Sequence, residues 1–282
     1  MAPVIDIHVH IQPREMLRRE AEEVMRRGRV DHDEILKYSE SPGEFLKYMD
    51  RAGIERAGLI NYVSPDVMGL TAEVNDWTAR YCSCDPRRLL AFGSVHPRYV
   101  ADAAAEVDRL KSLGIRGLKV HPAHQLFAPN EYRHGLGPLR AMYERAQSLE
   151  MPVMIHTGTS IFTGARNVYA QPIFADDVGV DFPGLSVILA HGGRPLWMEE
   201  AFFLVRRHKN MYMDISGIPP RKLLEYFPRL EEIAGKVLFG TDWPSPGVAD
   251  IRGNIEAFRA LLLSPAAQQQ ILYDNAARLF PV

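Results

Sequence analysis

Two histidines near the start of the chain are spaced so that both could bind one metal ion. They lie in the apolar run Pro3-Val4-Ile5-Asp6-Ile7-His8-Val9-His10-Ile11, which has the composition of a buried strand. Residues two apart on a strand share a face, so His8 and His10 are expected roughly 6–7 Å apart at the backbone, with Asp6 one step earlier on that face. Neutral imidazole is a common ligand of zinc and of other transition metals. Taken alone, the pair fits two core histidines as well as half of a metal site.

The elements that must position these histidines follow a regular order. Short β-rich runs alternate with helical patterns along the whole chain. The expected strands are Val4–Ile11, Arg56–Val63, Leu89–His96, Ile115–His121, Val153–Thr157, Ser186–His191, Met211–Ser216 and Val237–Trp243. The expected helices between them include Pro42–Ala52, Thr71–Cys84, Ala101–Leu113, Leu136–Leu149, Pro195–His208 and Pro219–Ile233. The strands are nearly continuous apolar runs, as expected when both faces of a sheet are covered. This order predicts an α/β protein with a (β/α)8 TIM barrel, and a doubly wound sheet is the alternative.

Two segments lie outside this repeat. The connection Gln12–Glu40 is rich in charge and is expected to form a solvated helix near the barrel mouth. The segment Ser264–Phe280 has an amphipathic pattern and is expected to form an extra C-terminal helix against the outside of the barrel. No linker or low-complexity tract divides the chain, so residues 1–282 are expected to form a single domain.

Composition narrows the class of protein further. The chain has 282 residues, of which 46% are hydrophobic, and a formal net charge of −2. No basic run stands out, so neither a nucleic acid nor an anionic membrane is an expected partner. The N-terminus has no signal-peptide pattern and no apolar run approaches the roughly 20 residues that span a bilayer. We therefore expect a cytoplasmic protein with its two cysteines, Cys82 and Cys84, reduced.

Ionisable side chains gather at the ends of the expected strands. In a (β/α)8 barrel, the C-terminal ends of the strands build the active site. The residues at these ends are His8, His10, His96, Lys119, His121, His156, His191 and Asp242. Burying so many ionisable groups together is costly unless they pair or bind a metal. The strand ends therefore favour a catalytic metal site at the barrel mouth.

Taken together and in order, the motifs at these ends resemble the amidohydrolase superfamily, in particular amidohydrolase family 2. This branch includes the aminocarboxymuconate semialdehyde decarboxylase-like proteins and related lactonases and hydratases. The matching motifs are His8-Val9-His10, Gly117-Leu118-Lys119-Val120-His121-Pro122, His156-Thr157-Gly158, Ala190-His191-Gly192-Gly193, Gly240-Thr241-Asp242-Trp243-Pro244 and the closing run from Ile271 to Phe280. The resemblance covers essentially the full length of the chain.

The resemblance implies a metal site and catalytic groups around it. His8, His10, His156 and Asp242 would be the metal ligands. Three neutral nitrogens and one carboxylate suit Zn2+ and leave a coordination place for water or substrate. One zinc per chain is favoured, although Mn2+ would accept the same ligands and some members of the superfamily hold a second metal.

Two further residues of this set are assigned catalytic roles by the resemblance. His191 would act as a catalytic or substrate-polarising residue in a mononuclear site, or as a ligand in a binuclear one. Lys119 would be an ammonium that stabilises a carboxylate or an oxyanion, with a carboxylated lysine bridging two metals as the alternative. Asp242 would share the proton transfer with His191.

Three residues are candidates for substrate binding. His121 shares the face of Lys119 on its strand. Arg166 lies in the long loop Gly158–Ala170, and Arg194 follows the sixth strand. Either guanidinium could hold a substrate carboxylate with two hydrogen bonds, and either would also fit an ordinary surface arginine.

The expected function is a metal-dependent hydrolase of a small organic molecule with a lactone, ester or amide carbonyl, using metal-activated water. The alternative is a metal-dependent non-oxidative decarboxylase of an aromatic or muconate-type acid. Several aromatic-acid decarboxylases of this branch begin the first strand with Glu-x-His, whereas this chain has His8-x-His10. A hydratase and a non-catalytic ligand-binding barrel are less favoured. The expected partner is a small-molecule substrate. The C-terminal helix and the Phe202-Phe203 pair would suit a homodimer, but they also fit an ordinary core.

Overall fold

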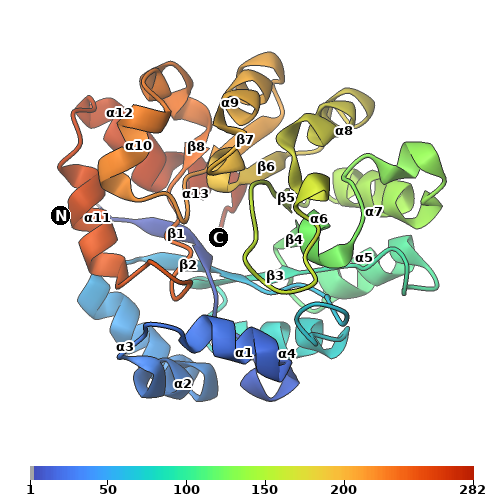
Figure 1. The fold of residues 1–282 in the computed structure, drawn as a ribbon, viewed down its shortest axis with the longest axis horizontal. Helices are drawn as coiled ribbons and strands as arrows, with labels where there is room; N and C mark the ends of the chain where they lie inside the picture. Colours follow the sequence, from blue (N-terminus) through green and yellow to red (C-terminus); the bar gives the residue numbers. More distant parts are fainter. Residues whose placement is uncertain (1–2) are drawn as a thin grey trace.

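A parallel barrel forms the centre of the computed structural model, which describes residues 3–282 (Figure 1). The strands are β1 (Ile5–Val9), β2 (Arg56–Ile60), β3 (Leu89–Gly93), β4 (Gly117–Val120), β5 (Val153–His156), β6 (Val187–Ala190), β7 (Met211–Asp214) and β8 (Val237–Leu238). Each strand pairs in parallel with the next one along the chain. The TIM-barrel prediction is confirmed, and the doubly wound alternative is wrong because the strands follow sequence order around the sheet.

Backbone hydrogen bonds between the two ends of the sheet close the ring. Ile7 N donates to Phe239 O at 3.0 Å, just beyond the end of β8. Asp242 N donates to His8 O at 2.8 Å, and His10 N donates to Trp243 O at 2.8 Å. Because β1 is paired on both sides, the barrel has no open edge there, and the segment carrying Asp242 is fixed against the segment carrying both histidines.

Helices surround the barrel (Figure 1). They are α1 (Arg19–Arg26), α2 (His32–Glu40), α3 (Pro42–Ala52), α4 (Glu73–Cys82), α5 (Ala103–Ser112), α6 (Pro122–Gln125), α7 (Gly137–Ser148), α8 (Ala175–Asp181), α9 (Met198–Arg207), α10 (Leu223–Tyr226), α11 (Ile251–Arg259), α12 (Pro265–Gln269) and α13 (Asn275–Leu279). Within the described part of the chain, no helix is both long and apolar enough to cross a membrane.

Two expected helices are interrupted. The single helix expected over Gln12–Glu40 is wrong, because α1 ends before Gly28, which adopts a φ of 75°, and α2 begins after it. The helix expected over Pro219–Ile233 is divided after α10. Phe227 precedes Pro228 and has φ −126° and ψ 72°, because proline disfavours the helical conformation in the residue before it.

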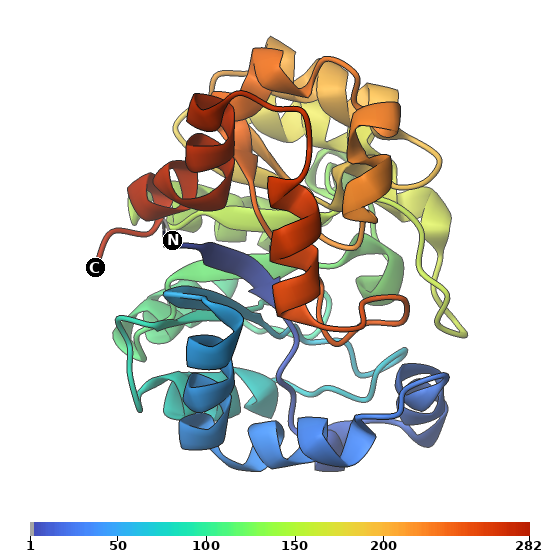
Figure 2. The ribbon, with the colours of Figure 1, turned by 90° about the vertical axis from the view of Figure 1, so that its left-hand side faces the viewer.

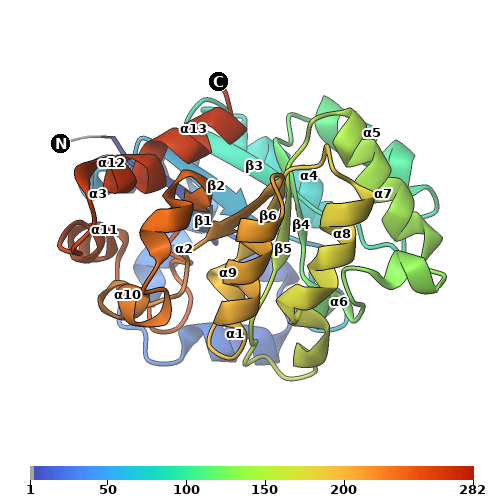
Figure 3. The ribbon, with the colours of Figure 1, turned by 90° about the horizontal axis from the view of Figure 1, so that it is seen from above.

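The C-terminal segment forms the expected extra helix, but its expected position against the outside of the barrel is wrong, because Ala276 and Phe280 pack into the inner core at the N-terminal end. It runs through α12, a π-helical turn at Gln270–Asp274, and α13, beginning at Ser264, whose Oγ accepts from Ala267 N at 3.3 Å. Asn275 Nδ2 donates to Val237 O, at the start of β8, at 2.7 Å. The helix therefore covers the N-terminal end of the barrel, beside β1 (Figures 2 and 3). The C-terminal ends of the strands remain accessible at the opposite end.

A β-bulge in β1 changes which side chains face the barrel interior. Asp6 pairs with Ala57 and Val9 pairs with Leu59, so three steps along β1 match two along β2. Ile7 packs in the inner core, and the next residue, His8, nevertheless lines the cavity described below. The expectation that Asp6 shares the face of His8 is wrong, because Ile5 and Ile7 on either side of Asp6 pack in the inner core and the bulge then brings His8 to that side.

Asp6 is instead bonded to the strand on the other side. Its carboxylate accepts from Thr241 N at 3.0 Å and from Thr241 Oγ1 at 2.7 Å. On the β2 side of the bulge, a Cβ added to Gly58 would lie 2.4 Å from the Ile7 carbonyl oxygen. The bulge therefore requires glycine at this position of β2.

Two apolar layers pack around the strands. One fills the barrel interior and its N-terminal end, and the other fills the space between the strands and the surrounding helices. Phe202 packs against the outer layer, whereas Phe203 is 52% exposed, and the homodimer stays a prediction. Cys82 is buried and Cys84 is exposed, and both are free thiols.

Candidate metal centre

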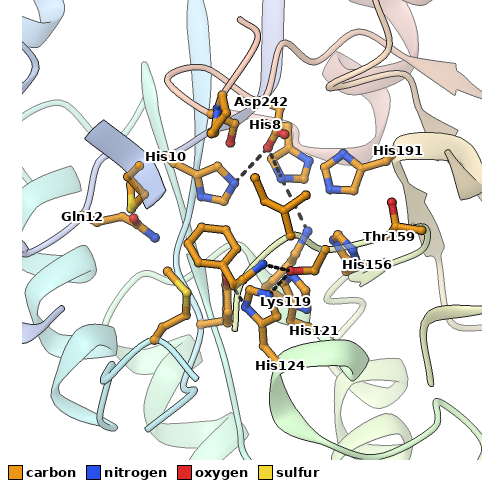
Figure 4. Close-up of a pocket in the computed structure, with 18 of the residues that line it drawn as sticks. His8, His10, Gln12, Lys119, His121, His124, His156, Thr159, His191 and Asp242 are labelled. Atoms are coloured by element: carbon orange, nitrogen blue, oxygen red, sulfur yellow. Dashed lines mark hydrogen bonds and ion pairs between the residues drawn. The ribbon is translucent and has the colours of Figure 1, made fainter. Parts of the chain in front are cut away.

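A cavity of about 160 Å³ opens at the C-terminal ends of the strands, and side chains from most strands point into it (Figure 4). Its lining residues are His8, His10, Gln12, Met25, Tyr62, Met68, Lys119, His121, His124, His156, Thr159, Ser160, Ile161, Phe162, His191, Arg194, Asp242, Ser245 and Pro246. Of the residues that were assigned a ligand, catalytic or substrate-binding role, Arg166 alone does not line it. Arg166 is exposed on the loop after β5, where its backbone N donates to Ala123 O at 2.9 Å.

Ligand atoms converge on one side of this cavity. His8, His191 and Asp242 each offer a nitrogen or carboxylate oxygen within 4.8 Å of the others. His8 Nε2 lies 3.7 Å from Asp242 Oδ1, and His10 Nε2 lies 3.1 Å from the same oxygen. Two of the four expected ligands, His8 and Asp242, therefore belong to this group together with His191, and a third, His10, contacts the same oxygen of Asp242.

The fourth expected ligand, His156, lies across the cavity at the end of β5. Its ring stacks on that of His121 with 3.8 Å between centroids, and its centroid is 4.7 Å from that of His191. The Nε2 atom of His156 is buried and has no hydrogen-bond partner. A buried nitrogen without a partner is costly, and a bound cation would satisfy it. We call His8, His10, His156 and Asp242 the ligand set.

The protonation states of these groups suit a metal. Burial, with the nearby charge of Lys119, lowers the pKa of His8 to about 4. Burial also lowers the pKa of His156 well below its ordinary value, and the positive charge on neighbouring groups adds to this. Burial opposes the charge on Asp242, but the hydrogen bond with His10 and the charge of Arg194 outweigh it and lower the pKa of that carboxyl. Neutral imidazoles beside a carboxylate are donors that Zn2+ and Mn2+ accept, so the residues fit a metal.

Two cationic side chains lie beside the ligand set. Lys119 Nζ is 3.5 Å from His8 Nε2, and burial lowers the pKa of this amine to about 8, with Asp214 and Asp242 opposing the shift. Arg194 Nη2 donates to Asp242 Oδ2 at 3.1 Å. At neutral pH Lys119 is therefore mainly an ammonium, and it favours an anionic group in the cavity together with the Arg194 guanidinium.

Two residues of the site have a left-handed backbone. His191 follows β6 with a φ of 64°, and Asp242 follows β8 with a φ of 67°. This conformation costs a residue other than glycine about 1–2 kcal/mol. Both residues line the cavity from these positions, so the local strain accompanies the placement of functional groups.

Some residues of the site were not found from the sequence, and others were placed differently. Tyr62 and Gln12 line the cavity although neither was expected there. His124 also lines it, with Nδ1 3.0 Å from Tyr62 Oη and Nε2 2.6 Å from Ser160 Oγ. His96 is buried outside this lining.

Asp214, at the end of β7, contacts His8 from behind the cavity at 2.9 Å. Asp214 and Ser216 are two polar residues on one face at the end of the seventh expected strand, as His8 and His10 are on the first. The same inspection of the seventh strand would have found both residues.

Comparisons with known proteins agree with this architecture. The model of a family described as amidohydrolase matches residues 5–282. No curated protein sequence matches the chain. An uncharacterised TIM-barrel protein from Bordetella bronchiseptica is 22% identical with a TM-score of 0.75, covering 99% of this chain and 98% of the other.

Two further solved structures carry names that indicate activities. A dihydroxybenzoic acid decarboxylase from Polaromonas, with bound manganese, is 21% identical with a TM-score of 0.70, covering 99% of this chain and 97% of the other. A probable 2-pyrone-4,6-dicarboxylic acid hydrolase from Acinetobacter baumannii is 17% identical with a TM-score of 0.68, covering 100% of both chains. At these identities the likeness shows the shared barrel fold.

Proposed function

The chain belongs to the amidohydrolase family, whose members are metal-dependent enzymes, and from this premise we propose that it is a metal-dependent hydrolase. Its substrate is a small anionic molecule with a lactone, ester or amide carbonyl. The observation that carries the proposal is the convergence of His8, His191 and Asp242, whose nitrogen and oxygen atoms lie within 4.8 Å of one another, with His10 against the same aspartate, in a cavity that also contains two cations. Among the metals that fit the ligand set, we favour a single Zn2+, while the Polaromonas decarboxylase makes Mn2+ the first alternative.

A metal held by the ligand set would polarise the substrate carbonyl and promote ionisation of a water molecule. His191 is neutral because burial and the charge of Arg194 lower its pKa well below the ordinary value, so it can accept a proton during the attack of water. The same imidazolium then returns the proton to the leaving group. The carboxylate of Asp242, whose Oδ1 lies beside His10, is a second group that can hold this proton in transit.

The two cations complete the mechanism by binding charge. Lys119 offers an ammonium to the oxyanion that develops as the carbonyl is attacked. Arg194 lies at the edge of the cavity, where its guanidinium can bind a carboxylate of the substrate. His121 stacks between His156 and His124, so both faces of its ring are covered and only the edge of the ring can contact a substrate in the cavity.

Decarboxylation is the second candidate, because the same two cations can hold the carboxylate that would leave as CO2. The name of the manganese-containing structural neighbour adds to this candidate. In that reaction the bond between the substrate carbon and its carboxylate breaks, and His191 or Asp242 delivers a proton to the carbon. The roles of the ligand set would be unchanged.

One experiment separates the two candidates. The purified protein is stripped of metal, reloaded with Zn2+ or Mn2+, and incubated with a panel of lactones, esters, amides and hydroxybenzoic acids. The hydrolase predicts metal-dependent release of acid without CO2, and release of CO2 without cleavage of any lactone, ester or amide overturns it in favour of the decarboxylase. A His8→Ala variant should lose both the metal and the activity. His134→Ala removes an exposed histidine outside the cavity and is the matched control.

A further inference from the structure

Two polar residues at the end of β7 contact the site from behind. Asp214 and Ser216 are fully buried, and neither lines the cavity. We call this pair the β7 hub. It connects two histidines that are far apart in the sequence, His8 in β1 and His191 after β6. Its proposed action rests on the metal site described under the proposed function.

Asp214 is surrounded by hydrogen-bond donors. Its Oδ2 lies 2.9 Å from His8 Nδ1. Its Oδ1 accepts from the backbone N of His191 at 3.2 Å, from the backbone N of Ser216 at 2.9 Å, and from the Ser216 hydroxyl. A carboxylate accepts hydrogen bonds and donates none, so the Nδ1 atom of His8 must carry the proton in this contact.

Ser216 extends the same constraint to the second histidine. Its hydroxyl has a single proton, which it donates to Asp214, so its oxygen can only accept from other groups. That oxygen lies 2.9 Å from His191 Nδ1 and 3.0 Å from His8 Nδ1, and the carbonyl oxygen of Ser216 is 3.1 Å from His191 Nδ1. The Nδ1 atom of His191 must therefore also carry a proton.

We propose that the β7 hub holds His8 and His191 together in the tautomer protonated at Nδ1, with both Nε2 lone pairs directed into the cavity. His8 is thereby prepared to bind a metal, and His191 is prepared to accept a proton. Asp214 and Ser216 are positioning residues in this arrangement.

Packing supports the proposal, because a Cβ added to Gly240 would lie 2.9 Å from His8 Cβ and 3.1 Å from Ser216 Cβ. The close backbone of this segment leaves the hub and the His8 ring little space to move apart.

A first experiment reads the tautomers directly. Nitrogen-15 NMR of the metal-free wild-type protein distinguishes the protonated from the unprotonated ring nitrogen of each histidine, and His8→Gln and His191→Gln variants assign the signals. The proposal expects a protonated Nδ1 and a bare Nε2 in both residues near pH 7. A dominant Nε2-protonated form in either histidine overturns it. This readout does not depend on metal binding or on activity.

A second experiment uses an isosteric substitution of the carboxylate. In Asp214→Asn the three donors around Oδ1 retain the amide oxygen, so the amide NH2 group faces His8 Nδ1. Two donors cannot share that contact, and His8 is forced into the tautomer whose Nε2 is protonated. Zn2+ titration should then show an affinity about 10–100-fold weaker than that of the wild type. The Co2+-loaded variant should also show an altered absorption spectrum.

Ser216→Ala tests the other arm of the hub. This change removes the hydroxyl beside His191 while Asp214 still accepts from His8, so Zn2+ affinity should remain near that of the wild type. The carbonyl oxygen of residue 216 still accepts from His191 Nδ1, so His191 should keep the tautomer protonated at Nδ1, and kcat should fall by less than about tenfold. A dominant Nε2-protonated form of His191 in this variant would contradict the proposal.

Asn275→Leu is the control for a general loss of stability. Asn275 is buried at the other end of the barrel, where its Nδ2 donates to Ala234 O and Val237 O, each at 2.7 Å. This variant should unfold more easily and keep both the metal affinity and the histidine signals.

The two proposals fail in distinguishable ways. If Asp214→Asn binds Zn2+ as tightly as the wild type, the hub is rejected and the proposed function is not. The hub is also rejected if Asn275→Leu loses as much Zn2+ affinity as Asp214→Asn. A wild-type protein that binds no metal rejects the proposed function, and the nitrogen-15 signals still decide whether the hub exists.

Discussion

His96 should make the stability of the protein depend on pH in a way that a single substitution removes. The residue is 3% exposed, and the centroid of its ring lies 4.5 Å from that of the Tyr99 ring. Its Nε2 atom is buried and has no hydrogen-bond partner. Its Nδ1 accepts from the backbone N of Arg98 at 3.4 Å. Protonation would place a second N–H against this donor, in a site that offers the charge no compensating group at hydrogen-bond distance.

The size of the effect follows from the pKa of this imidazole. Burial lowers the pKa of His96 from 6.5 to about 4. The unfolded chain therefore binds a proton as the pH falls below 6.5, while the folded protein does not until the pH approaches 4. Stability falls across this window and is fully retained above it. The gap corresponds to about 3 kcal/mol in total and about 2 kcal/mol at pH 5, at about 1.4 kcal/mol for each pH unit.

Urea unfolding of the wild type and of His96→Asn, in chelator at pH values from 7.5 to 4.5, measures this contribution. The asparagine oxygen can still accept from Arg98 N, and every other titrating group is common to both proteins. The free energy of unfolding of the wild type should decrease relative to the variant by about 2 kcal/mol between pH 7.5 and pH 5. His134→Asn, at an exposed site, reports the effect of removing a histidine as such. If the wild type and His96→Asn differ in free energy of unfolding by the same amount at every pH, the reasoning is refuted.

Three further predictions concern the site. Zn2+ at about 100 times its Kd should raise the free energy of unfolding by about 2.7 kcal/mol, measured by urea titration with and without chelator. Equal free energies of unfolding under the two conditions would exclude specific binding to the folded state. Arg194→Met should raise KM for an anionic substrate by about tenfold or more while Arg166→Met leaves it nearly unchanged, and similar effects of both would contradict the placement of these arginines. Gly217→Ala should raise KM as Arg194→Met does, because the added Cβ would lie 2.5 Å from Arg194 Nη2 and residue 217 has a φ of 65°. A wild-type KM in Gly217→Ala would show that the guanidinium can move without consequence.

The arrangement of strands could be predicted from the sequence because each strand is a separate apolar run. Once the runs form a barrel, their C-terminal ends must meet, so His8, His156, His191 and Asp242 could be placed around one cavity without knowledge of any contact. The strands were predicted too long at their ends, where the same polar residues leave the sheet. Pro228 was a visible reason to divide the helix that was expected to cross it.

Features that depend on a second segment could not be predicted in this way. The bulge in β1 depends on how its register meets β2 and on space left by Gly58, and no pattern within β1 indicates it. The pairing of Arg194 with Asp242 joins two loops that are distant in the sequence. Arg166 had the same residue type and a comparable loop position, so only the path of the loop distinguishes it from Arg194.

The left-handed backbone at His191 and Asp242 has a consequence for attempts to engineer this protein. Glycine would adopt either conformation without the steric cost that the present residues bear, which is about 1–2 kcal/mol at each position. Variants selected for heat resistance alone would therefore be expected to accumulate substitutions at these two positions and to lose the reaction as they do so. A screen that retains function must score turnover together with thermal tolerance, because at these positions the two properties favour different residues.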